Sequence, residues 1–181
     1  MVKMKALVVF GTRYGSTEEV AKEIGKALDS SGIQATLVDA KGAGSDLAGF
    51  DLVVIGSGIR AGAWVKEAKA FLKRNQQQLA TKKVALFVSC GFATAPPAKR
   101  EKAKEMYLDR IASQFSLAPV SMGFFGGCIK FNEDHGFMHK MVARSAKKEA
   151  KRGSMDICDR LDKRDWEQVR AWTRDLAMKV K

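Results

Sequence analysis

Cysteine is scarce in this chain of 181 residues: only Cys90, Cys128 and Cys158 are present, and they are far apart. Without a Cys-x-x-Cys pair, the chain is not expected to form a disulfide framework or a zinc site, and it fits a reducing compartment. It also lacks an apolar run close to the roughly 20 residues that span a bilayer, and its first residues lack the pattern of a secretory signal. We therefore expect one domain, residues 1–181, in the cytoplasm.

Histidine and acidic residues are also in short supply. His135 and His139 are the only two histidines, and no third Cys, His or carboxylate stands in helical register with them, so no metal site is predicted. The formal net charge of +12 favours an acidic partner, such as lipid headgroups, nucleic acid or a carboxylate-bearing substrate. Because the sequence has no helix-turn-helix, zinc pattern or aromatic-rich basic strand, we expect it to bind no nucleic acid.

The first part of the chain predicts an anion site. Met4–Phe10 is a nearly unbroken apolar run, as expected for a strand buried on both faces. Small and hydroxyl side chains follow over Gly11–Ser16, and a helical apolar pattern begins at Thr17. Ser16 and Glu19 have the spacing of a capping box. Backbone N–H groups and the positive end of the helix dipole converge where such a helix starts, so the loop is suited to an anion.

Two common nucleotide-binding motifs are absent from this loop. No lysine lies between Gly11 and Thr17, which excludes the Walker form, and the Rossmann pattern Gly-x-Gly-x-x-Gly is also missing. The hydroxyl groups of Thr12, Ser16 and Thr17 remain, and they suit one phosphate monoester better than a pyrophosphate or a magnesium triphosphate. The alternative is an ordinary strand-to-helix turn that binds no ligand.

Strand and helix patterns alternate along the rest of the chain. We expect strands at Ile33–Val38, Phe50–Ser57, Val84–Ser89 and Pro119–Ile129, the last weakened or bulged by its glycines. Further helices are expected at Trp64–Asn75, Lys99–Phe115 and Asp165–Val180. This alternation predicts an α/β fold, a parallel sheet with helices on both faces. The loops that follow three strands would then meet at one edge and could touch a single ligand: Gly11–Ser16, Ser57–Trp64 and Ser89–Ala95.

The segment Asn132–Arg164 is longer than the connection that such a fold needs before its last helix. Within it, positively charged residues recur at helical spacing and form a basic stripe: Lys140, Arg144, Lys147 and Lys151. One interpretation is a solvated helix that packs on the sheet edge through its apolar face. The other is an interfacial helix that brings the protein into peripheral contact with an anionic membrane.

The loop Thr12–Thr17 resembles the FMN-phosphate loop of flavodoxins, Ser/Thr-x-Thr-Gly-x-Thr, and departs from it at Tyr14. Its Thr-Arg-x-Gly form is more similar to the flavodoxin-like menaquinone-dependent protoporphyrinogen IX dehydrogenases. Ile55–Gly62 and Asp165–Val169 support this narrower resemblance, which runs over nearly the full length. It implies a five-stranded, doubly wound sheet of order 2-1-3-4-5 with an insertion before the last helix, and FMN bound where the strand order reverses.

The resemblance implies an FMN-dependent oxidoreductase of haem biosynthesis. It would dehydrogenate protoporphyrinogen IX to protoporphyrin IX and pass the electrons to a quinone, and the insertion would approach the membrane where the quinone resides. The alternative is a flavodoxin-type FMN electron carrier that docks on redox partner proteins. Flavodoxin-like carriers tend to be acidic, so the charge of +12 counts against this alternative.

The resemblance also assigns the cofactor contacts. The phosphate would be held by Thr12, Arg13, Tyr14, Gly15, Ser16 and Thr17. The flavin ring would be lined by Ser57, Gly58, Ile59, Arg60, Ser89, Cys90, Gly91 and Phe92. No separate catalytic base is expected, because the flavin does the redox chemistry.

Three of the residues around the ring have open roles. Trp64 could stack on the flavin or belong to the core. Arg60 could lie near the reduced flavin, bind a propionate of a porphyrin, or bond to loop carbonyls as a surface arginine. Cys90 could modulate the flavin or be a small buried thiol.

Overall fold

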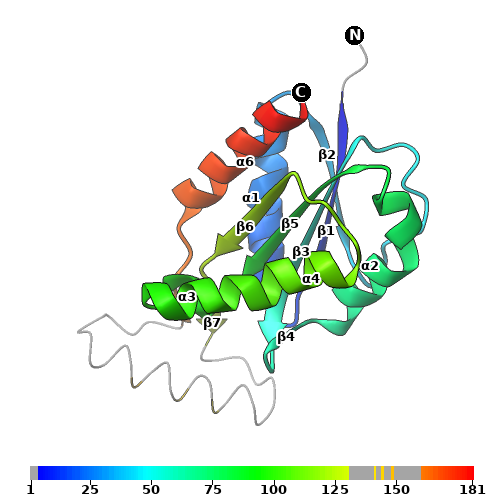
Figure 1. The fold of residues 1–181 in the computed structure, drawn as a ribbon. Helices are drawn as coiled ribbons and strands as arrows, with labels where there is room; N and C mark the ends of the chain where they lie inside the picture. Colours follow the sequence, from blue (N-terminus) through cyan, green and yellow to red (C-terminus); the bar gives the residue numbers. More distant parts are fainter. Residues whose placement is uncertain (1–3, 131–140, 142–143, 145–147, 149–159) are drawn as a thin grey trace.

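Five parallel strands form the central sheet of the computed structural model, which describes residues 4–130, 141, 144, 148 and 160–181 (Figure 1). In chain order they are β1 (Lys5–Gly11), β2 (Gln34–Asp39), β3 (Leu52–Arg60), β5 (Lys83–Ser89) and β6 (Ser121–Phe125). Across the sheet their order is β2-β1-β3-β5-β6, and each neighbouring pair is parallel. Counting these strands alone gives the order 2-1-3-4-5, so the predicted α/β fold is confirmed.

The apolar runs of the strands serve both faces of the sheet, because successive side chains of a strand point to opposite sides. In β1, Leu7 and Val9 join one apolar core, whereas Ala6 and Val8 join the other. The core of Ala6 and Val8 is covered by α1 (Ser16–Ser30) and α6 (Trp166–Val180). The opposite core is covered by α2 (Lys66–Leu79), α3 (Pro97–Lys104) and α4 (Arg110–Gln114).

The helices follow the sequence patterns closely. At the start of α6, Asp165 is the N-cap residue, and its carboxylate accepts a hydrogen bond of 3.0 Å from the N–H of Gln168, so the helix begins where the sequence places it. The expected helix Lys99–Phe115 corresponds to α3 and α4, which are joined by a single π turn at Glu105–Asp109. Helix α2 begins two residues later than predicted from Trp64, and it ends at Leu79.

The expectation of one strand over Pro119–Ile129 is wrong. After β6 and a pair of glycines, the chain forms β7 (Cys128–Lys130), which pairs antiparallel with β8 (Arg160–Asp162) in a separate two-stranded sheet. A Cβ atom on Gly126 would lie only 1.8 Å from the carbonyl oxygen of Lys163. A glycine is therefore required where these two backbone segments meet, and the strand is interrupted there.

The loop expected over Ser57–Trp64 is a hairpin. Strand β3 continues to Arg60 and pairs antiparallel with β4 (Ala63–Trp64). Its turn residues Ala61 and Gly62 have φ angles of 48° and 75°, and two positive φ angles are characteristic of the tight mirror-image turns of hairpins. The second loop at the sheet edge is therefore a short, hydrogen-bonded element.

Most of the predicted insertion, Asn132–Arg164, lies outside the described residues, as do His135 and His139 and all but Arg144 of the basic stripe. Among the residues that are described, no helix combines the length and the apolar character needed to cross a bilayer. The same residues include no group of three or more His, Cys, Asp or Glu side chains placed to hold a metal ion.

Candidate functional site

The loop between β1 and α1 is organised by a glycine. Gly15 has a φ of 80°, in the left-handed region, and its N–H donates a hydrogen bond of 3.0 Å to Oγ1 of Thr12. The capping box predicted from Ser16 and Glu19 is wrong, because Gly15 is the N-cap residue and no side chain of the described chain caps α1. The first turn of α1 is therefore left open to a ligand, and its N–H groups and dipole favour an anion.

The hairpin of β3 and β4 lies directly beside this loop. A Cβ atom on Gly58 would lie 2.8 Å from Oγ1 of Thr17, so the absence of a side chain lets the two segments approach. The neighbouring Ser57 is fully buried. Its hydroxyl group donates to the carbonyl oxygen of Gly58 at 2.7 Å and accepts from the N–H of Val65 at 3.0 Å. Ser57 thus braces the hairpin internally.

Trp64 belongs to the core, which is one of the two roles that the sequence left open for it. Its side chain is buried among α2 and the residues around Tyr107, and its indole N–H donates a hydrogen bond of 2.6 Å to the carbonyl oxygen of Tyr107. A buried indole requires such a partner, and this bond fixes the ring within the core. Trp64 does not line the cavity described next.

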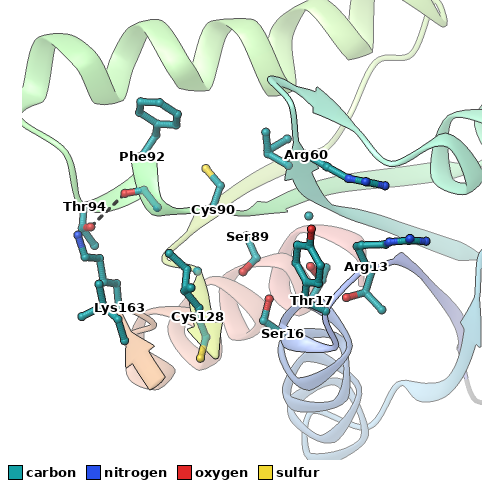
Figure 2. A pocket seen from close by; sticks show the side chains of 18 of the residues that line it. Arg13, Ser16, Thr17, Arg60, Ser89, Cys90, Phe92, Thr94, Cys128 and Lys163 are labelled. Carbon is teal, nitrogen blue, oxygen red and sulfur yellow. Dashed lines mark hydrogen bonds between the residues drawn. The ribbon is translucent and has the colours of Figure 1, made fainter. Parts of the chain in front are cut away.

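A cavity of about 630 Å³ lies where the three loops meet (Figure 2). This volume is within the range of small-molecule sites. All but three of the predicted cofactor contacts line it, and the exceptions are Gly15, Ser57 and Trp64. Arg13 and Arg60 lie at one end, Ser89 and Cys90 in the middle, and Lys163 at the far end. The geometry therefore gathers the sequence-predicted residues, although their contacts with a cofactor stay predictions.

Two further parts of the cavity wall were not assigned as cofactor contacts. The first comprises Ala61, Thr94 and Ala95, which lie within the predicted loops Ser57–Trp64 and Ser89–Ala95, and Val65, Pro96 and Lys99, which follow these loops. The other comes from β7, β8 and the residues beside them, which contribute Gly127, Cys128, Ile129, Leu161 and Lys163. The sequence predicted a helix from Lys99, but it gave no sign that the start of this helix would face the site. The β7–β8 wall had no local signal, because its two strands are distant in sequence.

The third loop, Ser89–Ala95, is held at its start by hydrogen bonds to the end of β6 and to Gly126, and its tip is exposed. The Ser89 hydroxyl donates to the carbonyl oxygen of Gly126 at 2.9 Å, and the N–H of Cys90 donates to the carbonyl oxygen of Phe125 at 3.0 Å. The 3-10 helix η1 (Gly91–Thr94) follows, and it presents a Phe92 side chain that is 48% exposed. An exposed aromatic ring at the rim of a cavity is a natural contact for a planar ligand.

All charged side chains among the described residues that line the cavity are positive. Its described lining residues include four cations, Arg13, Arg60, Lys99 and Lys163, and no acidic side chain. Positive charge is placed at both ends, because Arg13 and Arg60 lie opposite Lys163 (Figure 2). Such a site attracts a ligand with more than one negative group.

Comparison with known proteins identifies the family. The family model for the flavodoxin domain matches residues 7–156. The chain belongs to the flavodoxin-domain family. The fold agrees, because this flavodoxin domain superposes on a flavodoxin from Archaea with a TM-score of 0.59 at 16% identity, over 98% of this chain and 99% of the other. A flavodoxin of Streptococcus pneumoniae gives a TM-score of 0.57 at 14% identity, over 97% of both chains.

Two curated relatives are named for an enzymatic activity. The protoporphyrinogen IX dehydrogenase [quinone] of Escherichia coli K12 is 26% identical over 96% of this chain and 95% of its own length. The protein of the same name from Leishmania major is 24% identical over 96% of this chain and 74% of its own length. Both similarities run through nearly the whole flavodoxin domain.

FMN is the cofactor of this flavodoxin domain, and the residues present fit it. The open start of α1 and the hydroxyl groups of Thr12, Ser16 and Thr17 would hold its single phosphate. Gly58 and Gly91 line the cavity without side chains, and a Cβ atom on Gly91 would meet nothing within 4 Å. The cavity is therefore open at Gly91 in the third loop, on the side where a flavin ring would be accommodated.

Burial raises the pKa of the Cys90 thiol to about 11, although hydrogen bonds from the backbone of Phe92 and Ala93 oppose the rise. We therefore expect Cys90 of the FMN-free protein to react slowly with iodoacetamide at pH 8, with a rate that increases up to about pH 11. Because the folded protein holds this proton more tightly than the unfolded chain, the thiol's contribution to stability is full below about pH 9.0 and is lost towards pH 11.

The alkylation rate is measured by mass spectrometry on a variant that keeps only Cys90, with Cys128→Ser and Cys158→Ser. Adding Cys90→Ser gives the blank. A midpoint near the ordinary cysteine value of 9.0 would mean that the thiol is reached by water, and would contradict its burial.

Proposed function

We propose that this flavodoxin domain is an FMN-dependent dehydrogenase that oxidises protoporphyrinogen IX and delivers the electrons to a quinone. The proposal rests chiefly on the cavity, because part of its lining lies outside the three flavin loops and is apolar and cationic, with Pro96, Lys99, Ile129, Leu161 and Lys163 among its residues. We call this part of the lining the substrate compartment. The near full-length similarity to the two relatives of that name supports it. A carrier that only exchanges electrons with other proteins does not need a compartment for a substrate.

The compartment suits the chemistry of a porphyrinogen. Its walls are apolar at Pro96, Ile129 and Leu161, which favours burial of a macrocycle. Lys99 and Lys163 add positive charge near these walls, which favours the two propionate groups of the substrate. Arg60 keeps two possible roles in this proposal, as a contact of the flavin or of a propionate.

In this mechanism the bound FMN supplies the electron-accepting chemistry. The chain itself has three tasks. The phosphate loop fixes the cofactor, the apolar walls exclude water from the reacting face, and the cations orient the substrate by its carboxylates. Since no acidic side chain lines the described cavity, no protein carboxylate is assigned as a general base.

The second candidate function is an electron carrier of flavodoxin type, because the solved structures that share the fold include flavodoxins. A carrier would exchange electrons with a redox protein and would not oxidise a porphyrinogen by itself. Peripheral contact with an anionic membrane and a location at its cytoplasmic face remain part of the dehydrogenase proposal. They rest on the basic stripe of the sequence, most of which lies outside the described residues.

The deciding assay is protoporphyrinogen IX oxidation by the FMN-loaded protein, followed by porphyrin fluorescence with and without a menaquinone analogue. We expect the double variant Lys99→Ala with Lys163→Ala to raise the KM about tenfold, because each lost charge pair is worth up to about 1 kcal/mol. The affinity for FMN should change less than about twofold.

The matched control is Lys69→Ala with Lys73→Ala, which removes two lysines of α2 that do not line the cavity and should leave the KM unchanged. If the wild-type protein binds FMN but oxidises no porphyrinogen with any quinone, the dehydrogenase proposal fails and the carrier moves to first place.

A further inference from the structure

A buried arginine lies behind the phosphate loop. Arg164 follows β8, and none of its side-chain surface is exposed. Its guanidinium group donates to the carbonyl oxygen of Ser16 at 3.2 Å and pairs with the carboxylate of Glu19 at 2.9 Å. It also binds both carboxylate oxygens of Asp162, at 2.8 and 2.5 Å. One side chain therefore joins the end of β8 to the first turn of α1.

Packing alone does not explain this residue. A guanidinium group is costly to bury unless its charge and its donors are satisfied, and an apolar side chain of similar size can replace such a group without loss of stability. Burial by itself lowers the pKa of Arg164, but the hydrogen bond and charge of Asp162 raise it above its ordinary value. The group therefore stays charged, and its directional bonds are available to fix other atoms.

The bond to Ser16 acts on the peptide group that faces the ligand. In a trans peptide, the carbonyl group of one residue and the N–H of the next point in opposite directions. Fixing the carbonyl oxygen of Ser16 from behind therefore fixes the direction of the Thr17 N–H in front. The Thr17 hydroxyl lies on the same side, next to Gly58 and within the cavity lining.

We propose that Arg164 is a positioning residue for the cofactor phosphate: it holds the Ser16–Thr17 peptide so that the start of α1 is pre-set to receive the phosphate of FMN. The proposal rests on FMN as the cofactor and not on the porphyrinogen substrate. Arg164 would increase the binding free energy of FMN by pre-organisation, since the loop would not have to be ordered when the cofactor binds.

The position of Arg164 is itself fixed from the other side of the cavity. The N–H of Lys163 donates to the carbonyl oxygen of Gly127 at 2.9 Å, and the carbonyl oxygen of Lys163 lies against Gly126. Gly126 in turn accepts the hydrogen bond of Ser89 from the third loop. The residue that positions the phosphate loop is therefore anchored to the loop that lines the flavin side of the cavity.

The test compares FMN with riboflavin, which has the same ring and lacks the phosphate. For Arg164→Met we expect the Kd for FMN to rise about tenfold, the effect of one hydrogen bond to a charged group. The Kd for riboflavin should change less than about twofold. Arg164→Lys should recover part of the FMN affinity, because it keeps the charge and loses the fork of donors. Both affinities are measured by quenching of flavin fluorescence.

The matched control is Arg170→Met. Arg170 lies in α6 and, like Arg164, is bound to a glutamate of α1, through an ion pair of 2.9 Å with Glu23. Glu23 is one turn beyond Glu19, and in the described chain Arg170 has no hydrogen bond or ion pair with the phosphate loop. This variant should leave both affinities unchanged. Asp162→Asn weakens the hold of the end of β8 on Arg164 with little change in side-chain volume, and it provides a second test with the same expected results if Arg164→Met does not fold.

Two outcomes overturn the proposal. Equal losses of FMN and riboflavin affinity would mean that Arg164 stabilises the fold in general and not the phosphate site. An unchanged FMN affinity would mean that the phosphate loop keeps its conformation without Arg164. Melting temperatures of the FMN-free variants are measured alongside. Neither outcome depends on porphyrinogen oxidation, so the result is separate from that of the dehydrogenase assay.

Discussion

The double variant Thr12→Ala with Thr17→Ala is expected to weaken FMN binding by at least about a hundredfold. A hydrogen bond from a hydroxyl to a charged phosphate is worth roughly 1.5–3 kcal/mol, and two such bonds are lost. Thr12 has a second task, because it accepts the N–H of Gly15 at 3.0 Å. Its loss therefore also loosens the loop before the ligand binds.

Isothermal titration with FMN and with riboflavin tests this result. Riboflavin affinity should fall much less, because riboflavin lacks the phosphate that these hydroxyl groups would hold. Thr81→Ala is the control, since that hydroxyl is exposed and bonds only locally to the carbonyl oxygen of Gln78 among the described residues. A folded double variant that binds FMN as tightly as the wild type would move the phosphate to another part of the cavity.

Gly126→Ala is expected to lower the free energy of unfolding by at least about 2 kcal/mol, at the upper part of the range for overpacked sites. The new methyl group would meet the backbone of Lys163, with its carbonyl oxygen at 1.8 Å and its carbonyl carbon at 2.5 Å. Backbone atoms cannot turn aside as a flexible side chain can. The segment that carries Arg164 must therefore shift, so FMN affinity should fall as well.

Urea unfolding of the FMN-free protein measures the change in stability. Gly49→Ala is the matched control, because a Cβ atom there would meet nothing within 4 Å and the change should stay within about 0.5 kcal/mol. An unchanged unfolding free energy for Gly126→Ala would show that the junction between β6 and β7 moves without cost. The account of why the strand ends there would then be wrong.

Sequence patterns were sufficient to predict the parts of the site that are formed by residues close together in the chain. The strand, loop and helix over residues 4–30 follow one another directly, so the apolar run and the small residues predicted the elements and the place where α1 begins. The rule that parallel strands place their carboxyl ends at one edge then brought Gly58, Ser89 and Phe92 to the same cavity. These predictions needed no knowledge of which side chains touch.

Local patterns were not decisive where a residue had two plausible environments. Trp64 follows the second loop, and its spacing suits a flavin contact as well as a core position. Only the contact with the carbonyl oxygen of Tyr107, 43 residues further on, places it in the core. Ser16 similarly had the spacing of a capping residue, but the left-handed Gly15 starts the helix one residue earlier than that role requires.

The sequence by itself determined the α/β class, the order of its elements and the small-residue loop between β1 and α1, because each depends on periodicity and on residues that are neighbours in the chain. The tertiary structure alone decided the β7–β8 wall, the cations Lys99 and Lys163 in the cavity, and the contact of Arg164 with Ser16. That contact joins residues 148 positions apart. Such pairings depend on where a strand leaves the sheet. Here the close approach of the backbones at Gly126 and Lys163 decides where the strand ends, and the periodicity of the sequence contains no information about that approach.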